Sequence, residues 1–261
     1  MAIKRRFSGY VFDLDGTIYL GDALLPGARS TVETLRRAGA RVVFLSNNPL
    51  HSRSDYAAKL SRLGIPTTPD AVVNSSWVMN RWLTCEMPGA TLFVVGEPPL
   101  IAELREAGFD FSEQAGEIDV VVASFDRTFD YHKLQVAFDA IRAGARFVAT
   151  NADRYCPTPG GGLPDAAAVI GAIEGCTGVP VEVVVGKPSP ITAREILARL
   201  ALPAAECLMI GDRLETDVRM GQEAGMSTAV VLTGVTTLDL LAISEVQPEF
   251  VLNRLDELTA C

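Results

Sequence analysis

YVFDLDGT, residues 10–17, is the stretch of this chain that decides its fold. Three apolar residues run into two carboxylates and a glycine turn, which predicts a buried strand that ends at Asp13. In an open parallel sheet, ligands bind just beyond the carboxyl ends of the strands. Asp13 and Asp15 therefore stand where a substrate is expected, although an acidic turn without function would look the same locally.

Short apolar runs of the same kind recur along the chain, at residues 42–45, 181–185, 208–210 and 229–232. Helical stretches separate them, such as residues 28–38, where Ala28, Val32 and Leu35 recur at helical spacing before Gly39. This alternation predicts an α/β fold with a doubly wound, Rossmann-like parallel sheet.

A second set of alternating segments occupies the middle of the chain, at residues 92–95, 98–107, 120–123, 134–141 and 147–149. The chain is 261 residues long, which is enough for two domains. We expect residues 78–180 to form an inserted α/β domain, and residues 1–77 and 181–261 to form the catalytic domain.

Composition limits the classes of function. The formal net charge of -9 argues against a nucleic-acid partner, and no apolar run is long enough to span a membrane. Five scattered cysteines fit a reducing cytoplasm, where we expect the protein to reside. With two histidines in the chain, a zinc site of His and Cys ligands lacks residues, so any metal should be bound by oxygen.

Three further polar clusters each follow an apolar run: Ser46-Asn47-Asn48, Gly186-Lys187-Pro188, and Gly211-Asp212 with Asp217. A hydroxyl, a lysine and a second acidic pair at successive strand ends are what phosphoryl transfer to a carboxylate requires. Each cluster also has an ordinary structural explanation, such as a loop lysine or a helix cap. Four such clusters together favour a shared site.

In order along the chain, DLDGT (13–17), SNN (46–48), GKP (186–188) and GDRLETD (211–217) resemble the four motifs of the haloacid-dehalogenase (HAD) superfamily. Residues 18–19, 26–28, 149–153 and 171–178 are similar to its NagD-like, 4-nitrophenylphosphatase-like branch. The resemblance covers nearly the whole chain. It implies a HAD core with an inserted α/β cap and a phosphatase that uses Mg²⁺.

The charges support a metal. A carboxylate that attacks a phosphate dianion is repelled by it. For each pair of charges about 4 Å apart, the repulsion is about 4 kcal/mol at an effective dielectric constant of about 20. Mg²⁺ suits a site of oxygen ligands and neutralises phosphoryl oxygens. The resemblance implies that the ligands are the Asp13 and Asp212 carboxylates and the Asp15 backbone carbonyl, with Asp217 as a supporting carboxylate.

The resemblance also implies roles for the motif residues. Asp13 is the nucleophile that forms an aspartyl-phosphate, and Lys187 keeps it ionised. The phosphate oxygens are bound by Ser46, Thr17 and the backbone N–H of Asn47. As a second carboxylate, Asp15 can protonate the leaving alkoxide and then activate water, which favours a phosphatase or a phosphomutase.

The expected substrate contacts in the cap are Asn151 and Asp153, which follow an apolar run in the same way. A structured turn is the alternative explanation for both. The triplet Pro164-Asp165-Ala166 departs from the Pro-Gly and small residues that related chains usually have.

We expect a phosphatase that acts on a small phosphorylated metabolite. The alternatives are a phosphomutase and a catalytically silent, phosphate-binding regulatory protein on the same fold. A response-regulator receiver would phosphorylate an Asp on a later strand, and the Gly186-Lys187 pair lacks the earlier glycine of a P-loop. The sequence does not select the substrate or the oligomeric state, and a homodimer through the cap is compatible with it.

Overall fold

The computed structural model describes residues 5–158 and 161–259. The chain divides into two compact units. The core unit comprises residues 1–46, 53–73 and 187–261, and the inserted unit comprises residues 47–52 and 74–186. The main breaks therefore fall at 73/74 and 186/187, where the sequence suggested 77/78 and 180/181. The short segment 47–52, which directly follows Ser46, belongs to the inserted unit.

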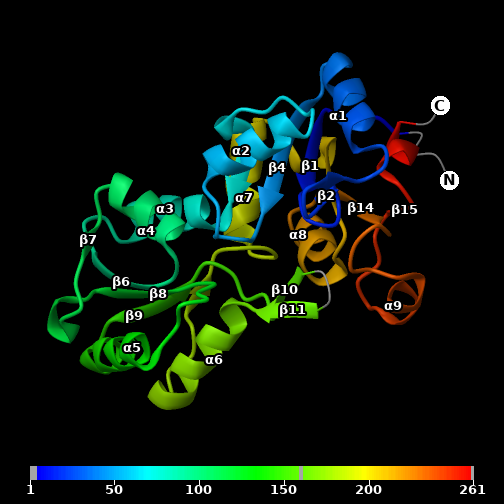
Figure 1. The fold of residues 1–261 in the computed structure, drawn as a ribbon. Coiled ribbons are helices and arrows are strands. Elements are labelled where there is room, and N and C mark those ends of the chain that lie inside the picture. The colour runs from blue at the N-terminus through cyan, green and yellow to red at the C-terminus, as the bar shows by residue number, and fades with distance from the viewer. Residues whose placement is uncertain (1–4, 159–160, 260–261) are drawn as a thin grey trace. The chain divides into compact units, whose positions relative to one another are not determined.

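The core unit is built on a sheet that has six strands within the described residues, in the order β15-β14-β13-β1-β4-β5. Figure 1 labels β1, β4, β14 and β15 of this sheet. The strands from β15 through β4 run parallel to their neighbours. Their bounds are β1 (Gly9–Asp13), β4 (Arg41–Ser46), β5 (Val72–Asn74), β13 (Cys207–Gly211), β14 (Ser227–Val231) and β15 (Phe250–Leu252). Strand β1 is buried throughout, which explains its uninterrupted apolar run.

Helices cover both faces of the core sheet. On one face, Phe12 and its neighbours pack with Val32 of α1 (Ala28–Arg37) and Leu60 of α2 (Arg53–Arg62). On the other face, α7 (Pro190–Leu200) lies against β4, and α8 (Arg219–Glu223) approaches β13 and β14. A Cβ at Gly221 of α8 would lie 2.6 Å from Thr228 Cγ2, so a glycine is needed for this approach. The doubly wound α/β fold is confirmed.

The order of the core strands reverses at β1. Strand β4, the next core strand along the chain, lies beside one edge of β1, and β13, which comes much later, lies beside its other edge. Phe12 of β1 pairs with Ile210 of β13, so the two strands end at the same edge of the sheet. At such a reversal of strand order the carboxyl ends of the two strands flank a crevice where ligands bind. Asp13 and Asp212 lie at these two ends.

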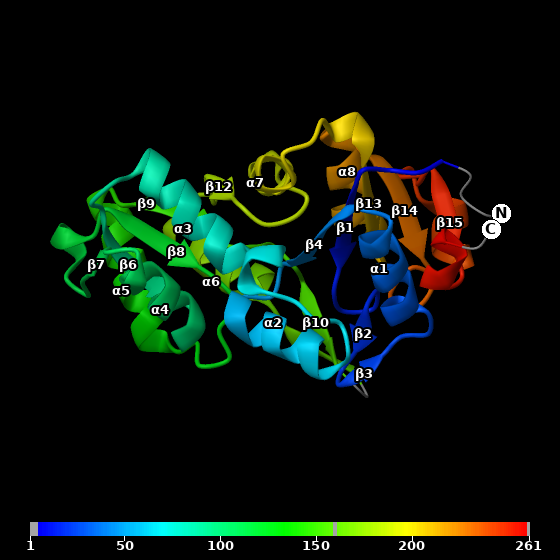
Figure 2. The same cartoon turned by 90° about the horizontal axis from the view of Figure 1, so that it is seen from above.

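The inserted unit has its own parallel sheet, with five strands in the described part of the chain and the order β12-β9-β8-β6-β7 (Figure 2). The strands are β6 (Thr91–Val95), β7 (Asp110–Phe111), β8 (Val120–Ala123), β9 (Arg146–Ala149) and β12 (Val183–Val184). The helices are α3 (Ser75–Glu86), α4 (Pro98–Glu106), α5 (Tyr131–Ala143) and α6 (Ala166–Thr177). Asp130 caps α5 by accepting from the Lys133 backbone N–H at 2.9 Å, and Gly144 ends that helix in the left-handed conformation.

The assignment of residues 181–185 to the core sheet is wrong. Val183 and Val184 pair with Val148 and Ala149 of β9, so β12 is the edge strand of the inserted sheet. The backbone N–H of Gly186 continues this pairing by donating to the Thr150 carbonyl at 2.8 Å. A short apolar run reports that a segment is a strand, but it carries no information about which sheet the strand joins.

The remaining elements are small. The core unit carries a hairpin of β2 (Tyr19–Leu20) and β3 (Ala23–Leu24), and the helix α9 (Leu238–Ile243). In the inserted unit, β10 (Tyr155–Thr158) and β11 (Gly161–Pro164) pair in antiparallel orientation. Across residues 5–158 and 161–259, no helix has the length and apolarity that crossing a membrane would take.

Candidate active site

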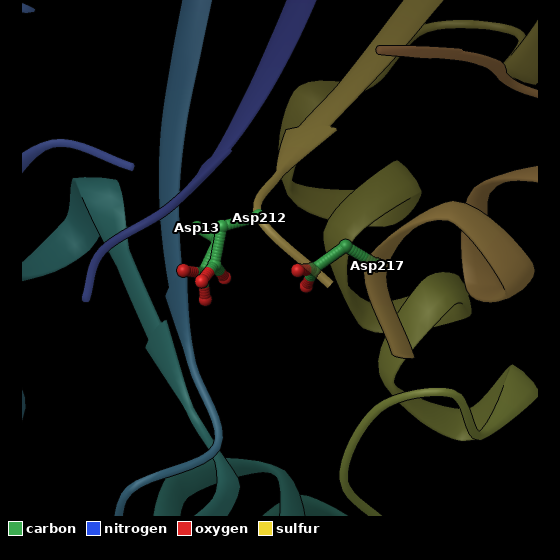
Figure 3. Close-up of side chains that lie close together, drawn as sticks. All are labelled: Asp13, Asp212 and Asp217. Atoms are coloured by element: carbon green, nitrogen blue, oxygen red, sulfur yellow. The ribbon is translucent and has the colours of Figure 1, made fainter. Parts of the chain in front are cut away.

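Three buried carboxylates meet at the carboxyl ends of β1 and β13 in the core sheet. Asp13, Asp212 and Asp217 each place one carboxylate oxygen within 4.8 Å of the others (Figure 3). Their exposed fractions are 7%, 2% and 0%. Acidic groups this close and this buried repel one another, so the fold must hold them in place and other charges must offset them.

The positions of the carboxylates follow from local structure. Asp13 is the last residue of β1, Asp212 directly follows β13, and Asp217 lies on a π-helical turn over Leu214–Val218. Two glycines make room for them. A Cβ at Gly211 would lie 2.2 Å from Asp217 Cγ, and one at Gly234 would lie 2.0 Å from Asp212 Oδ2. No side chain fits at either position while the carboxylates stay where they are.

Lys187 is the cation of the cluster. Its ammonium group donates to Asp13 Oδ1 at 2.5 Å and to Asp217 Oδ1 at 2.6 Å, and its side chain is 5% exposed. Lys187 is separated from both partners by long stretches of chain, so this arrangement exists only in the folded protein. Asp13, Lys187, Asp212 and Asp217 therefore lie together, although Lys187 follows a strand of the inserted sheet and not of the core sheet. Their catalytic roles stay predictions at this point.

The electrostatics of the cluster show a shortage of positive charge. Burial raises the pKa of Asp13 well above its usual range, although Lys187 opposes this shift. Burial and the neighbouring Asp217 raise the pKa of Asp212 to about 6. Burial also lowers the pKa of Lys187, but the charges of Asp13 and Asp217 outweigh it and the net shift is upward. The lysine therefore stays charged, while the carboxylates are only partly compensated.

The cluster fits a divalent cation. Three ionised carboxylates and one ammonium leave a formal charge of about −2, which one divalent ion would neutralise. All the donors are oxygens, the ligand type that Mg²⁺ prefers. Binding of such an ion would lower the raised pKa values of Asp13 and Asp212 and release protons.

The turn after β1 holds the other acidic residue of the first motif. Asp15 is exposed, whereas Thr17 is fully buried and its hydroxyl has no hydrogen-bond partner among the described residues. Between them, Gly16 has a φ of 87°, and a Cβ there would lie 2.5 Å from Asp212 Oδ2. The glycine thus permits both the left-handed turn and its close approach to Asp212.

A loop after β14 supports the site, and the sequence reading missed it. The backbone N–H of Val235 donates to Asp212 Oδ2 at 2.7 Å, and the Thr233 hydroxyl donates to the Gly16 carbonyl at 2.7 Å. The loop thereby fixes both Asp212 and the turn that follows β1. A signal was available, because Thr233 and Gly234 directly follow the apolar run of residues 229–232.

Ser46 ends β4, the strand next to β1. The preceding residue, Leu45, pairs with Asp13, which places Ser46 at the same edge of the sheet. Ser46 is 4% exposed, and its hydroxyl contacts the Tyr56 hydroxyl at 3.2 Å.

Asn47, Asn151 and Asp153 meet within the inserted unit. Asp153 Oδ2 accepts from the side-chain amides of Asn47 and Asn151, both at 2.9 Å. Asn151 is fully buried, and it also donates to Asp165 Oδ1 at 3.1 Å and accepts from the Thr150 hydroxyl at 2.9 Å. Asn151 therefore holds Asp153, which is half-buried. Asp165, the residue that departs from related chains, is part of this network and caps α6.

Removal of the Lys187 charge is expected to destabilise the core unit strongly. In Lys187→Met, two buried carboxylates lose their hydrogen-bonded counter-charge, and we expect a loss of about 3–5 kcal/mol in the free energy of unfolding. Urea unfolding with and without Mg²⁺ measures this loss, and Mg²⁺ should recover part of it by neutralising the same carboxylates.

Lys59→Met is the matched control for that measurement. The Lys59 ammonium lies 3.8 Å from the Tyr19 ring centroid and 4.0 Å from an exposed Asp22 carboxylate. Its loss should cost about 1 kcal/mol or less, with no dependence on Mg²⁺. Equal losses in the two variants would show that Lys187 does not offset the buried carboxylates.

Comparison with known families gives two matches. The family model described as haloacid dehalogenase-like hydrolase matches residues 10–110, and one described as HAD-hydrolase-like matches residues 184–258. Together the two matches include all four motifs and most of the core unit.

Individual proteins are similar over nearly the full chain. The sugar-phosphatase AraL of Bacillus subtilis is 42% identical, over 87% of this chain and 84% of that protein. The crystal structure of 4-nitrophenylphosphatase from Thermotoga maritima is 36% identical with a TM-score of 0.93, covering 97% of this chain and 96% of that chain. NagD from Escherichia coli K-12 is 28% identical with a TM-score of 0.88, covering 96% of this chain and 98% of that chain.

Proposed function

Because the chain belongs to the haloacid dehalogenase-like hydrolases, with NagD and 4-nitrophenylphosphatase among its structural relatives, we propose that it is a Mg²⁺-dependent phosphatase for small phosphomonoesters. The observation that carries this proposal is the cluster of three buried carboxylates and one buried lysine. A phosphate dianion at this cluster meets a nucleophile, Asp13, and an opposing positive charge, Lys187.

In the first step, an Asp13 carboxylate oxygen attacks phosphorus, and the bond from phosphorus to the leaving oxygen breaks. The phosphoryl group remains on Asp13 as an aspartyl-phosphate. Lys187 keeps Asp13 ionised and shares the charge of the phosphoryl oxygens. Ser46 and the backbone N–H of Asn47, the next residue, bind these oxygens. Thr17 is proposed to line the same site, which agrees with its buried hydroxyl that lacks a partner among the described residues.

Asp15 is the proposed general acid and base. It lies two residues from Asp13 on the same turn and is exposed, so it can exchange protons with solvent. It gives a proton to the leaving alkoxide in the first step. It then takes a proton from the water that attacks the aspartyl-phosphate, and free phosphate leaves.

The proposed ligands of Mg²⁺ are the Asp13 and Asp212 carboxylates and the Asp15 backbone carbonyl, with Asp217 as a supporting carboxylate. When bound, the ion neutralises phosphoryl oxygens and so removes part of the repulsion that Asp13 meets. The fit of this ligand set rests on the formal charge of the cluster and on its oxygen donors.

The proposed substrates are sugar phosphates. The relative from Bacillus subtilis, 42% identical to this chain, is named a sugar-phosphatase. In the inserted unit, Asp153 is half-buried and held by two amides, so its carboxylate is oriented, and a carboxylate accepts more hydrogen bonds than these two. Sugar hydroxyl groups are suitable donors to it. We propose that Asp153 contacts the leaving group and that Asn151 fixes its position.

Release of inorganic phosphate from a panel of sugar phosphates, nucleotide monophosphates and 4-nitrophenyl phosphate tests the function. We expect turnover with Mg²⁺ and a loss of about 10³-fold or more when a chelator removes the ion. Such a loss corresponds to one uncompensated charge pair of about 4 kcal/mol. Chelator saturated with Mg²⁺ is the control and should leave turnover unchanged.

The same panel separates the alternatives. A phosphomutase would convert a sugar phosphate into its isomer without net phosphate release. A silent phosphate-binding protein would bind phosphate and turn over none of the panel. Either result with fully folded protein would reject the phosphatase assignment.

A further inference from the structure

A tyrosine lies directly behind the hydroxyl that is proposed to bind phosphate. The Ser46 and Tyr56 oxygens are 3.2 Å apart, and the two residues are 4% and 2% exposed. Ser46 ends β4, and Tyr56 lies in the first turn of α2. The two are ten residues apart in the chain, but no local pattern requires them to meet.

The helix that carries Tyr56 is also tied to the turn after β1. Lys59 follows Tyr56 by three residues, so both side chains lie on the same side of α2. Its ammonium lies 3.8 Å from the centroid of the Tyr19 ring, which is fully buried. Tyr19 closes the turn of Asp15 and Gly16, because its carbonyl accepts from the Gly16 N–H at 2.8 Å. Through Tyr56 and Lys59, α2 contacts the last residue of β4 and the segment that follows β1.

The protons of the two hydroxyls constrain what Ser46 can do. Each hydroxyl has one proton, so Ser46 cannot donate to Tyr56 and to a phosphoryl oxygen at once. When Ser46 donates to the phosphate, its bond with Tyr56 persists only if the Tyr56 hydroxyl becomes the donor. Chained hydrogen bonds of this kind polarise and strengthen one another in a buried site.

We propose that Tyr56 is a positioning residue of the active site, which donates to the Ser46 hydroxyl and thereby directs the Ser46 proton toward a phosphoryl oxygen. This inference rests on the proposed function, since it takes Ser46 as a phosphate-binding residue. When no anion is bound, Ser46 donates to Tyr56, as the structure shows. Anion binding then reverses the direction of this bond, with Tyr56 as the donor and Ser46 as the acceptor.

A simpler explanation is that the bond only satisfies a buried tyrosine hydroxyl. In that case the loss of the hydroxyl would change the stability of the protein but not its affinity for phosphate. The two explanations therefore differ in a measurable quantity, the dissociation constant of inorganic phosphate.

The test is Tyr56→Phe in the full chain with Mg²⁺. We expect inorganic phosphate, titrated by calorimetry, to bind about threefold to tenfold more weakly, and kcat/KM to fall by a similar factor, as for one lost hydrogen bond. The same substitution in a Ser46→Ala background should have no further effect on phosphate affinity, because no serine hydroxyl remains to be directed.

Tyr10→Phe is the matched control. Tyr10 is 4% exposed in β1, and its hydroxyl accepts from the Phe7 backbone N–H at 3.2 Å. It lies three residues before Asp13, away from the carboxyl end of the strand. Its loss should lower stability in the same way as Tyr56→Phe and leave phosphate affinity unchanged.

Two results would overturn the inference: unchanged phosphate affinity in Tyr56→Phe, or an equal loss with and without Ser46. Failure of the proposed function would appear elsewhere, as a wild-type protein that releases no phosphate from any substrate. The calorimetric measurement reports on Tyr56 in either case.

Discussion

The Asp13→Asn protein is expected to turn over no substrate, with a rate at least about 10³-fold below that of the wild type. A carboxamide has nearly the shape of the carboxylate but lacks its nucleophilic, charged oxygen. The variant should fold, because it removes one of three mutually repelling buried carboxylates and leaves Lys187 paired with Asp217. Phosphate release from the substrate panel, together with circular dichroism, measures both quantities.

Asp22→Asn is the control for this prediction. Its carboxylate is 99% exposed in the same region of the core unit, so its loss should leave turnover unchanged. If Asp13→Asn retained wild-type turnover, the assignment of the nucleophile would be refuted.

The Asp15→Asn protein is expected to lose about 10²–10⁴-fold in steady-state rate, the usual contribution of general acid–base catalysis. The loss should depend on the leaving group. 4-Nitrophenolate leaves with little help from an acid, so the first step survives in this variant, while the second step lacks its base. Rapid-quench measurements should therefore show a burst of about one 4-nitrophenol per site, followed by slow turnover.

A sugar phosphate provides the comparison within the same variant. Its alkoxide needs a proton to leave, so the first step also slows and no burst should appear. Identical losses for both substrates, with no burst from 4-nitrophenyl phosphate, would show that Asp15 does not act as acid and base.

Much of the site follows from the sequence because one rule locates it. Polar residues that follow buried parallel strands lie along one edge of the sheet. This rule places Asp13, Ser46 and Asp212 correctly, since β1, β4 and β13 are neighbours. Lys187 reaches the cluster by a different route, because the strand before it belongs to the inserted sheet.

The parts that the sequence does not predict depend on contacts between distant residues. Nothing in the pattern of residues 47–52 places them with the inserted unit, because that grouping arises from contacts such as the one between Asn47 and Asp153. Likewise, Tyr56 is a buried position of α2, and no pattern in the sequence indicates that its hydroxyl meets Ser46. A homodimer through the cap and a cytoplasmic location stay predictions.

The most direct test of this account is the chemical identity of the phosphorylated residue. Asp15→Asn is mixed with 4-nitrophenyl phosphate and Mg²⁺ during the burst, quenched, and reduced with borohydride, which converts an aspartyl-phosphate into homoserine. Mass spectrometry of the peptides should find homoserine at position 13. Homoserine at any other aspartate, or a phosphoryl group on a serine or histidine, would contradict it.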